Sequence, residues 1–441
     1  MSRLSVSQGA AVSVGAVLGT GVISLPALGA QVAGPASLVA WLALVLLSVP
    51  LAMTFAALGA RYPDAGGVST YLRRAFGDRS AGLVGWCFYF AIPVGAPAAG
   101  FMGGAYVAAA FGGGTRTVLL TTAALIATVT VMNAFGLRIS GRVQLILACV
   151  LVTLLLVATI TALPHARLSN LEPFAPQGLA AVAPAAAVLV WGFAGWEAMT
   201  SLAGEFRNPS RDVPRATVIA LVVVSVLYLA IATTSLATLG PATATTEAPL
   251  AELLALGVGG GSVKIVTAVI ALLLTLGAMN AYFAGGAKLG AALARDGALP
   301  TWFARGSSAG EVPRRSLAGV AVLAGTALAV AATFGLDTQQ LVLLTTGAFV
   351  IVYVLGSAAA VRLLPRGSWS RRAAVVALIS SLALLATVGP ALLWPLGVAA
   401  LALIYLWLRG RRRARTPEAV PVVAAEIPAT APVADTNERG R

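Results

Sequence analysis

Two long apolar stretches of this 441-residue chain are interrupted by glycine, and these interruptions are where its chemistry is expected. The first stretch, residues 10–33, contains the segment Gly19 to Gly21, and the second, residues 180–203, contains the segment Gly192 to Glu197. A bilayer offers no water to free amides and carbonyls, so backbone that leaves the helix there has to line a cavity. Paired interruptions in the two halves of a membrane chain indicate a transporter's substrate site.

The first interruption predicts a site for a carboxylate. Opening a helix leaves free amides at the start of its second half, where the helix dipole is positive. Gly19 and Gly21 permit unusual dihedrals and the close approach of a ligand, and Thr20 adds a hydroxyl. The alternative is helix packing, because small residues let membrane helices approach one another.

The second interruption predicts a site for an ammonium group. Carbonyls freed near Gly192 and Phe193 carry the opposite polarity, so the two breaks together are able to hold both ends of an amino acid. Trp191 and Phe193 are candidates to cover the substrate side chain. Packing against lipid or the protein interior is the alternative for these aromatic residues.

Glu197 is the only acidic residue well inside any predicted span. A carboxyl group at membrane depth is costly and by default indicates a functional site. Two roles remain open for it: exchange of a proton during transport, and a structural hydrogen bond that braces the unwound segment.

Composition and charge predict a polytopic helical membrane protein. The chain is 59% hydrophobic and 10% charged, whereas soluble domains are about 25% charged. The net charge of +14 is concentrated in alternate linkers, because the intervening ones hold only Arg116, Arg167 and Lys264. The positive-inside rule then predicts cytoplasmic termini, and the charge needs no nucleic acid partner. We predict twelve spans, at 10–33, 36–60, 81–111, 117–136, 139–163, 180–203, 216–239, 262–285, 317–334, 338–361, 372–389 and 391–408.

The remaining reactive residues argue against an enzyme. Cys87 and Cys149 lie separately in apolar spans, and His165 lies alone in a predicted outer linker, so we expect no disulfide, no metal site and no cofactor. A channel needs a pore lined by polar or charged rings. No Gly-x-x-x-x-Gly-Lys-Ser/Thr loop for ATP occurs.

The order of the spans predicts two related halves. Residues 1–9 form a cytoplasmic lead and 10–408 the transporter domain, with a first repeat at about 10–163, a second at about 180–361 and two extra helices at about 372–408. Each repeat opens on a broken helix, and its odd number of five spans inverts the second copy. Residues 409–441 begin with an arginine cluster suited to anionic lipid and continue as a tail predicted to be disordered.

Three segments carry a resemblance to a known family. The start Gly-Thr-Gly-Val-Ile (19–23), the loop Arg-Tyr-Pro-Asp-Ala-Gly-Gly (61–67) and the stretch from Gly192 to Ala216 resemble the amino acid–polyamine–organocation (APC) permeases. Together with Ile-Pro-Val-Gly-Ala-Pro (92–97), they look most like the bacterial exporters of L-methionine and branched-chain amino acids. The resemblance covers essentially the whole membrane domain.

The resemblance implies an all-α, LeuT-like fold with discontinuous helices 1 and 6. It places the substrate at Gly19, Thr20, Gly21, Val22, Ile23, Trp191, Gly192, Phe193 and Gly195, with Glu197 in proton coupling or bracing and Asn280 and Tyr282 as possible cavity-lining residues. Some relatives carry a lysine in span five that stands in for sodium; this chain has none there.

We therefore predict a carrier in the inner (plasma) membrane that exports neutral, hydrophobic amino acids such as methionine, leucine, isoleucine and valine by proton antiport. The predicted partners are the amino acid, protons and the lipid bilayer. An uptake permease of the same fold, working by proton symport or exchange, is the alternative, and a nutrient sensor built on this fold is a further one.

Overall fold

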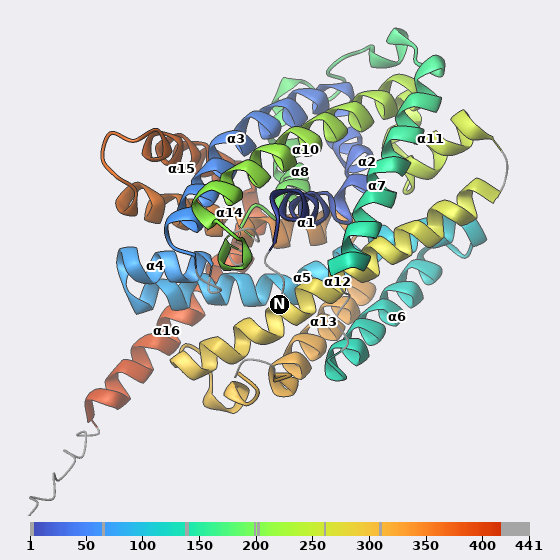
Figure 1. The fold of residues 1–441 in the computed structure, drawn as a ribbon. Helices are drawn as coiled ribbons and strands as arrows, with labels where there is room; N and C mark the ends of the chain where they lie inside the picture. Colours follow the sequence, from blue (N-terminus) through green and yellow to red (C-terminus); the bar gives the residue numbers. More distant parts are fainter. Residues whose placement is uncertain are drawn as a thin grey trace, which may run out of the picture.

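The computed structural model describes residues 4–63, 67–136, 141–197, 200, 203–259, 262–307 and 311–415, and almost all of them are helical (Figure 1). Ten segments of this described part are helical, long and apolar enough to cross a membrane. The protein is thus an all-α, multi-pass membrane protein. The predicted tail beyond residue 415 lies outside the described residues.

The first predicted span is two helices rather than one. Helix α1 (Val6–Leu18) ends at Gly19, and α2 (Gly21–Ala33) begins after Thr20. A short 3₁₀ turn, η1 (Gly34–Ala36), then leads into α3 (Ser37–Arg61).

The span that was predicted at 180–203 also stops being an α-helix midway. Helix α8 (Val182–Leu189) follows the 3₁₀ turn η4 (Leu179–Ala181) and passes into the 3₁₀ segment η5 (Val190–Phe193). Ala194 then has extended backbone, with φ −69° and ψ 131°. The apolar helical stretch Leu179–Phe193 is shorter than the other spans, and the predicted number of twelve crossings stays a prediction.

The other elements are α4 (Val68–Phe76), α5 (Asp78–Phe111), α6 (Gly114–Ala134), α7 (Gly141–Ala162), η2 (Leu163–His165), η3 (Leu168–Leu171), η6 (Ala203–Glu205), α10 (Pro209–Leu239), η7 (Gly240–Ala244), α11 (Pro249–Val258), α12 (Ser262–Asp296), η8 (Thr301–Ala304), α13 (Arg314–Phe334), α14 (Thr338–Leu363), α15 (Trp369–Thr387), η9 (Gly389–Leu392) and α16 (Leu393–Arg415).

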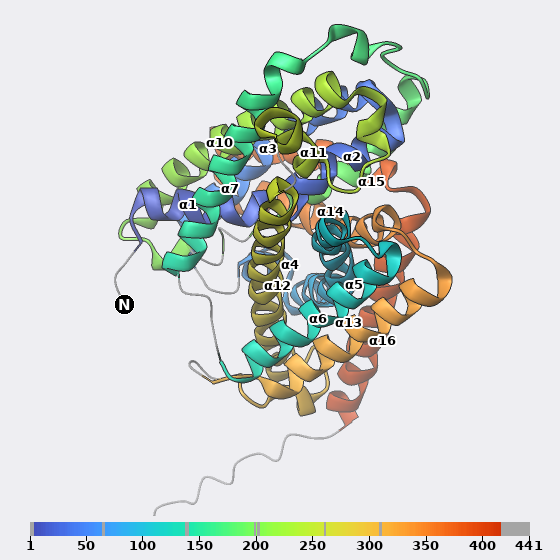
Figure 2. The same ribbon diagram turned by 90° about the vertical axis from the view of Figure 1, so that its right-hand side faces the viewer.

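The helices pack around two apolar cores (Figures 1 and 2). The larger core joins the broken helices to α3, α7, α10, α14 and α15. The smaller one is built mainly from α5, α6, α12 and α13, which lie together in both views, and from α16. Trp191 packs against both cores, so the second break lies at the seam between them.

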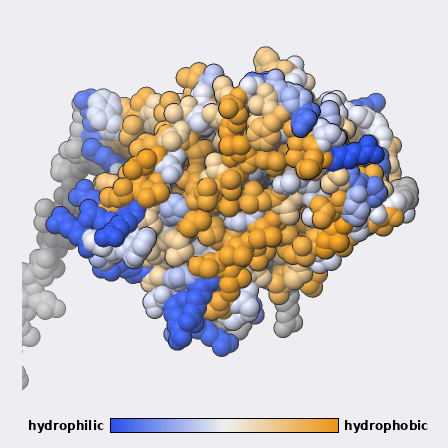
Figure 3. Space-filling model, turned by 90° about the horizontal axis from the view of Figure 1, so that it is seen from above, coloured by the Kyte–Doolittle hydropathy of each residue, from blue (hydrophilic) through white to orange (hydrophobic). Residues whose placement is uncertain are grey.

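The distribution of apolar residues on the surface is typical of a protein that is surrounded by a lipid bilayer. In Figure 3 hydrophobic residues cover the middle of the visible face, and hydrophilic residues gather towards its margins. Many large apolar side chains face outward from the spanning helices, Leu46, Ile160 and Ile379 among them. Such exposure costs nothing where the neighbour is lipid.

Some helices extend beyond the predicted membrane spans. The span predicted at 262–285 continues as α12 to Asp296, and α1 begins inside the predicted lead of residues 1–9. Two further helices, α4 and α11, lie in segments that were predicted as linkers. Both are short, and α4 is strongly amphipathic, so a search for long apolar runs passes over them.

Candidate functional site

The two breaks lie against each other in the interior. A Cβ atom added at Gly21 would lie 3.2 Å from Cα of Gly192 and 3.0 Å from Cδ1 of Trp191. The side chain of Leu25 also approaches both glycines. Gly21 and Gly192 are 171 positions apart in the sequence, yet their segments form one centre, in which the two backbones are in direct contact.

A second contact joins the breaks at Gly195. Its φ is +133°, a conformation that favours glycine, and a Cβ there would lie 3.0 Å from the carbonyl oxygen of Ala16 and 3.1 Å from Cα of Val17. The extended backbone after Phe193 thus passes directly over the last turn of α1. A larger residue at position 195 has no space.

The start of α2 presents free amides, as the carboxylate hypothesis requires. Gly19 has φ +36°, and Thr20 makes no capping hydrogen bond with its side chain. The first amides of a helix have no partner within it. Because α2 starts in the protein interior, with Val22 and Ile23 buried, its positive end faces protein rather than lipid.

Two tyrosine hydroxyls lie within hydrogen-bonding distance of the carbonyls that the breaks set free, and each has a single proton to donate. Tyr228 of α10 donates to Gly192 O at 2.6 Å and reaches Val17 O at 3.1 Å, and so connects both breaks. Tyr353 of α14 reaches Phe193 O at 3.2 Å. The carbonyls proposed for an ammonium group are therefore already engaged in this closed arrangement, and each keeps a second lone pair.

Glu197 lies in the same buried centre. One of its carboxyl oxygens, Oε2, accepts from the amide of Gly195 at 3.0 Å and from the hydroxyl of Tyr353 at 3.1 Å. The side chain is only 6% exposed. Glu197 therefore braces the extended backbone in this structure, and the geometry leaves its proton-coupling role as a prediction.

The aromatic residues of the second break divide into two groups. Phe193 is buried in a cluster with Trp41 and Tyr228, with ring centroids 6.0 and 5.1 Å away. Trp191 is only partly buried and lies between α2 and Gly95 of α5. Of the two, Trp191 is better placed to move with a ligand.

The two residues predicted on α12 have different surroundings. Asn280 is buried and accepts a hydrogen bond from Asn133 of α6 at 2.8 Å, so it holds two helices of the smaller core together. Tyr282, two residues further along the helix, is partly buried and packs against the smaller core.

The structure thus brings together the predicted residues from Gly19 to Ile23, from Trp191 to Gly195, and Glu197, and it adds three that the sequence did not indicate: Trp41, Tyr228 and Tyr353. A single aromatic residue in an apolar helix carries no distinguishing signal. Their contacts join positions that lie far apart in the chain, such as Tyr353 and Glu197 at a separation of 156 residues.

Comparison with known proteins gives a consistent family. A family model described as amino acid permease matches residues 4–427. The chain is 32% identical over 403 residues to the uncharacterized amino acid permease YecA of Bacillus subtilis, covering 91% of this chain and 95% of that protein. It is also 32% identical over 421 residues to the L-methionine/branched-chain amino acid exporter YjeH of Escherichia coli, covering 94% and 97%. The branched-chain amino acid permease BcaP of Bacillus subtilis matches at 27% identity, over 49% of this chain and 51% of that protein.

Proposed function

The chain belongs to the amino acid permease family, and on this premise we propose that it exports neutral, apolar amino acids through the centre formed by its two helix breaks. The family consists of transporters and not of enzymes, so the protein is an amino acid transporter. Methionine, leucine, isoleucine and valine are the proposed substrates, and the inner (plasma) membrane is the proposed location.

The observation that carries this proposal is the contact between Gly21 and Gly192. It puts the positive start of α2 beside the carbonyl end of η5, and these opposite polarities match the two charged ends of a zwitterion. The backbones are too close for a ligand atom to lie between these two glycines. Binding therefore requires α2 and η5 to move apart, which is how an alternating-access site would open.

The charges of the centre favour a neutral side chain. Among the described residues that meet at the breaks, Glu197 is the one acid, its Oε2 atom is already hydrogen bonded, and no lysine or arginine is among them. A charged substrate side chain would be buried without a partner, which is costly.

We also propose the direction of transport and the ion that drives it. Similarity to an exporter named for methionine and branched-chain amino acids, over 94% of this chain, favours export. Proton antiport is proposed because Glu197 is an ionisable group held where the substrate would bind. The proposed architecture is a LeuT-like pair of inverted five-helix repeats, followed by two helices, with both termini in the cytoplasm.

Radiolabelled counterflow in proteoliposomes tests the substrate class. Vesicles loaded with unlabelled leucine should accumulate external labelled leucine, and internal methionine, isoleucine or valine should support this exchange. Internal lysine or glutamate should not. Accumulation with lysine alone, or none with any of the four apolar amino acids, contradicts the proposal.

Uptake is the second candidate, favoured by the similarity to a protein named as a branched-chain amino acid permease. An imposed proton gradient separates the two. In an antiporter, leucine moves against the direction of proton flow, and in a symporter it moves with the protons. Movement with the protons would establish uptake and refute the antiport.

A further inference from the structure

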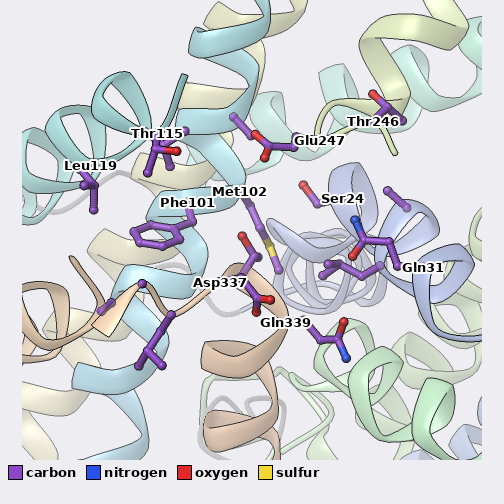
Figure 4. A pocket seen from close by; sticks show the side chains of 18 of the residues that line it. Ser24, Gln31, Phe101, Met102, Thr115, Leu119, Thr246, Glu247, Asp337 and Gln339 are labelled. Carbon is purple, nitrogen blue, oxygen red and sulfur yellow. The ribbon is translucent and has the colours of Figure 1, made fainter. Parts of the chain in front are cut away.

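A separate cavity lies beyond the helix breaks, along α2 (Figure 4). Its volume is about 330 Å³, at the lower end of the range for ligand pockets. The lining residues come from α2, α5, α6, α13, the start of α14 and the segment before α11. The distribution of arginine and lysine places this side of the protein outside the cell, because the basic linkers lie at the other ends of these helices.

Both charged residues that line the cavity are negative. Glu247, in the segment before α11, and Asp337, just before α14, both line it, and no arginine, lysine or histidine is among the lining residues. Figure 4 shows the two carboxylates approaching the cavity from different elements. Among the described residues Glu247 has no ion-pair partner, whereas Asp337 uses one oxygen to cap α14 by accepting from Gln340 N at 2.8 Å.

The floor of the cavity holds an unpartnered hydroxyl. Ser24 of α2 is 5% exposed, and its Oγ has no hydrogen-bond partner among the described residues. A buried hydroxyl without a partner costs free energy, which a ligand that donates a hydrogen bond would recover. The surrounding floor is apolar, with Leu28, Phe101 and Met102 buried there.

We propose that this cavity is a second, outer binding site for the ammonium group of a small apolar amine, including the amine end of an amino acid that is passing through the protein. Glu247 and Asp337 attract the positive charge, Ser24 Oγ accepts a hydrogen bond, and the apolar floor holds the side chain. That the bound amine is the transported amino acid rests on the proposed function. The existence of an ammonium site in this cavity does not rest on it.

The position of the cavity connects it to the central site. Ser24 follows Ile23, which is one of the proposed substrate-binding residues, so both sites share the first turns of α2. Tyr106 of α5 ties this region together: its hydroxyl donates to Ile23 O at 2.5 Å and accepts from the amide of Leu250 in α11 at 3.2 Å. An amino acid released at the central site would next meet this cavity.

The probe is 3-methylbutylamine, which is leucine without its carboxylate. It keeps the ammonium group and the side chain but gives the amides of α2 nothing to bind. Binding of the labelled amine to the full chain in phosphatidylcholine nanodiscs should saturate at one site per chain, above the signal of empty nanodiscs. 4-Methylpentanoate, which has the carboxylate and no ammonium group, should not compete.

Variants locate the site. The double variant Glu247→Gln/Asp337→Asn should weaken amine binding by about tenfold or more, since it removes both charge-assisted bonds. Asparagine also caps helices well, so α14 stays intact. Ser24→Ala should weaken binding by a few fold. Glu172→Gln is the matched control, because Glu172 is an exposed acid outside the cavity.

Gly192→Ala separates this proposal from the proposed function. The substitution disturbs the central site and should leave binding of the amine to the outer cavity unchanged. If leucine displaces the amine from this variant, the amino acid passes through the cavity. If leucine does not displace the amine, the proposed passage is overturned. The ammonium site is overturned if no saturable binding occurs, if binding survives the double variant, or if Gly192→Ala abolishes it. Amine binding without leucine counterflow would refute the transport proposal and leave the outer site standing.

Discussion

At the scale of single residues, three hydroxyl and carboxyl groups hold the broken backbone in place. Tyr228 reaches carbonyls of both breaks, and Tyr353 connects the carbonyl of Phe193 to Glu197. Unwound backbone inside a membrane survives only when its polar groups find such partners. If the proposed substrate site is correct, the same groups have to exchange partners when a substrate enters.

Glu197→Gln separates the two roles of this side chain. The amide oxygen of glutamine is still able to accept from Gly195 N and Tyr353 Oη, so the brace is retained, but it cannot exchange a proton. We expect the variant to keep its melting temperature within about 2 °C and to lose the response of leucine flux to a pH gradient. Gradient-driven flux equal to that of the wild type would remove the proton role and leave bracing.

Tyr228→Phe tests the link between the breaks. Loss of the hydroxyl leaves the carbonyls of Val17 and Gly192 short of a donor, which we expect to reduce the free energy of unfolding by about 1 kcal/mol. Thermal unfolding in detergent measures it. Tyr405→Phe is the control, since the Tyr405 hydroxyl makes no hydrogen bond with any residue that the structure describes. Equal shifts in both variants would show that the Tyr228 hydroxyl bonds contribute nothing.

At the scale of elements, α2 and η5 approach each other closely because each has a glycine, Gly21 and Gly192, at the contact. A methyl group at Gly192 would collide with the Leu25 side chain and the Tyr228 hydroxyl, at 2.6 and 2.8 Å. Gly285 of α12, by contrast, has nothing within 4 Å of an added Cβ. The two glycines allow the same substitution to be compared in a tight and in an open setting.

We expect Gly192→Ala to lower leucine counterflow by about tenfold or more, because the closed arrangement is strained by overpacking that costs about 1–3 kcal/mol. Gly285→Ala should transport normally. Protein level and size-exclusion profile report whether each variant folds. Normal counterflow in folded Gly192→Ala protein would contradict the role given to the contact.

The sequence predicted the breaks well and their partners poorly. Glycine inside an apolar span is a local signal, so the interruptions at Gly19 and Gly192 were placed correctly. Tyr228 and Tyr353 gave no local signal, because their roles depend on which helices become neighbours. The outer cavity could not be predicted either: Ser24, Glu247 and Asp337 come from three distant segments that meet only in the folded protein.

At the scale of the whole molecule, the account requires a particular orientation. Twelve crossings with cytoplasmic termini place His165 outside and Arg411 inside, and both residues are exposed in the structure. In a chain with Cys87 and Cys149 replaced by alanine, His165→Cys should react with a membrane-impermeant maleimide in intact cells. Arg411→Cys should react only after permeabilisation. Labelling of both from outside would contradict the proposed topology and would put the outer cavity on the wrong side.

The most direct test of the central claim is a binding titration that removes one charged end of the ligand at a time. It uses the Glu247→Gln/Asp337→Asn variant, so that only the helix breaks contribute. We expect leucine to bind, and both 4-methylpentanoate and 3-methylbutylamine to bind at least about 100-fold more weakly, because each loses a charge-assisted set of backbone bonds. If either analogue binds within a few fold of leucine, the two breaks do not hold the two ends of an amino acid.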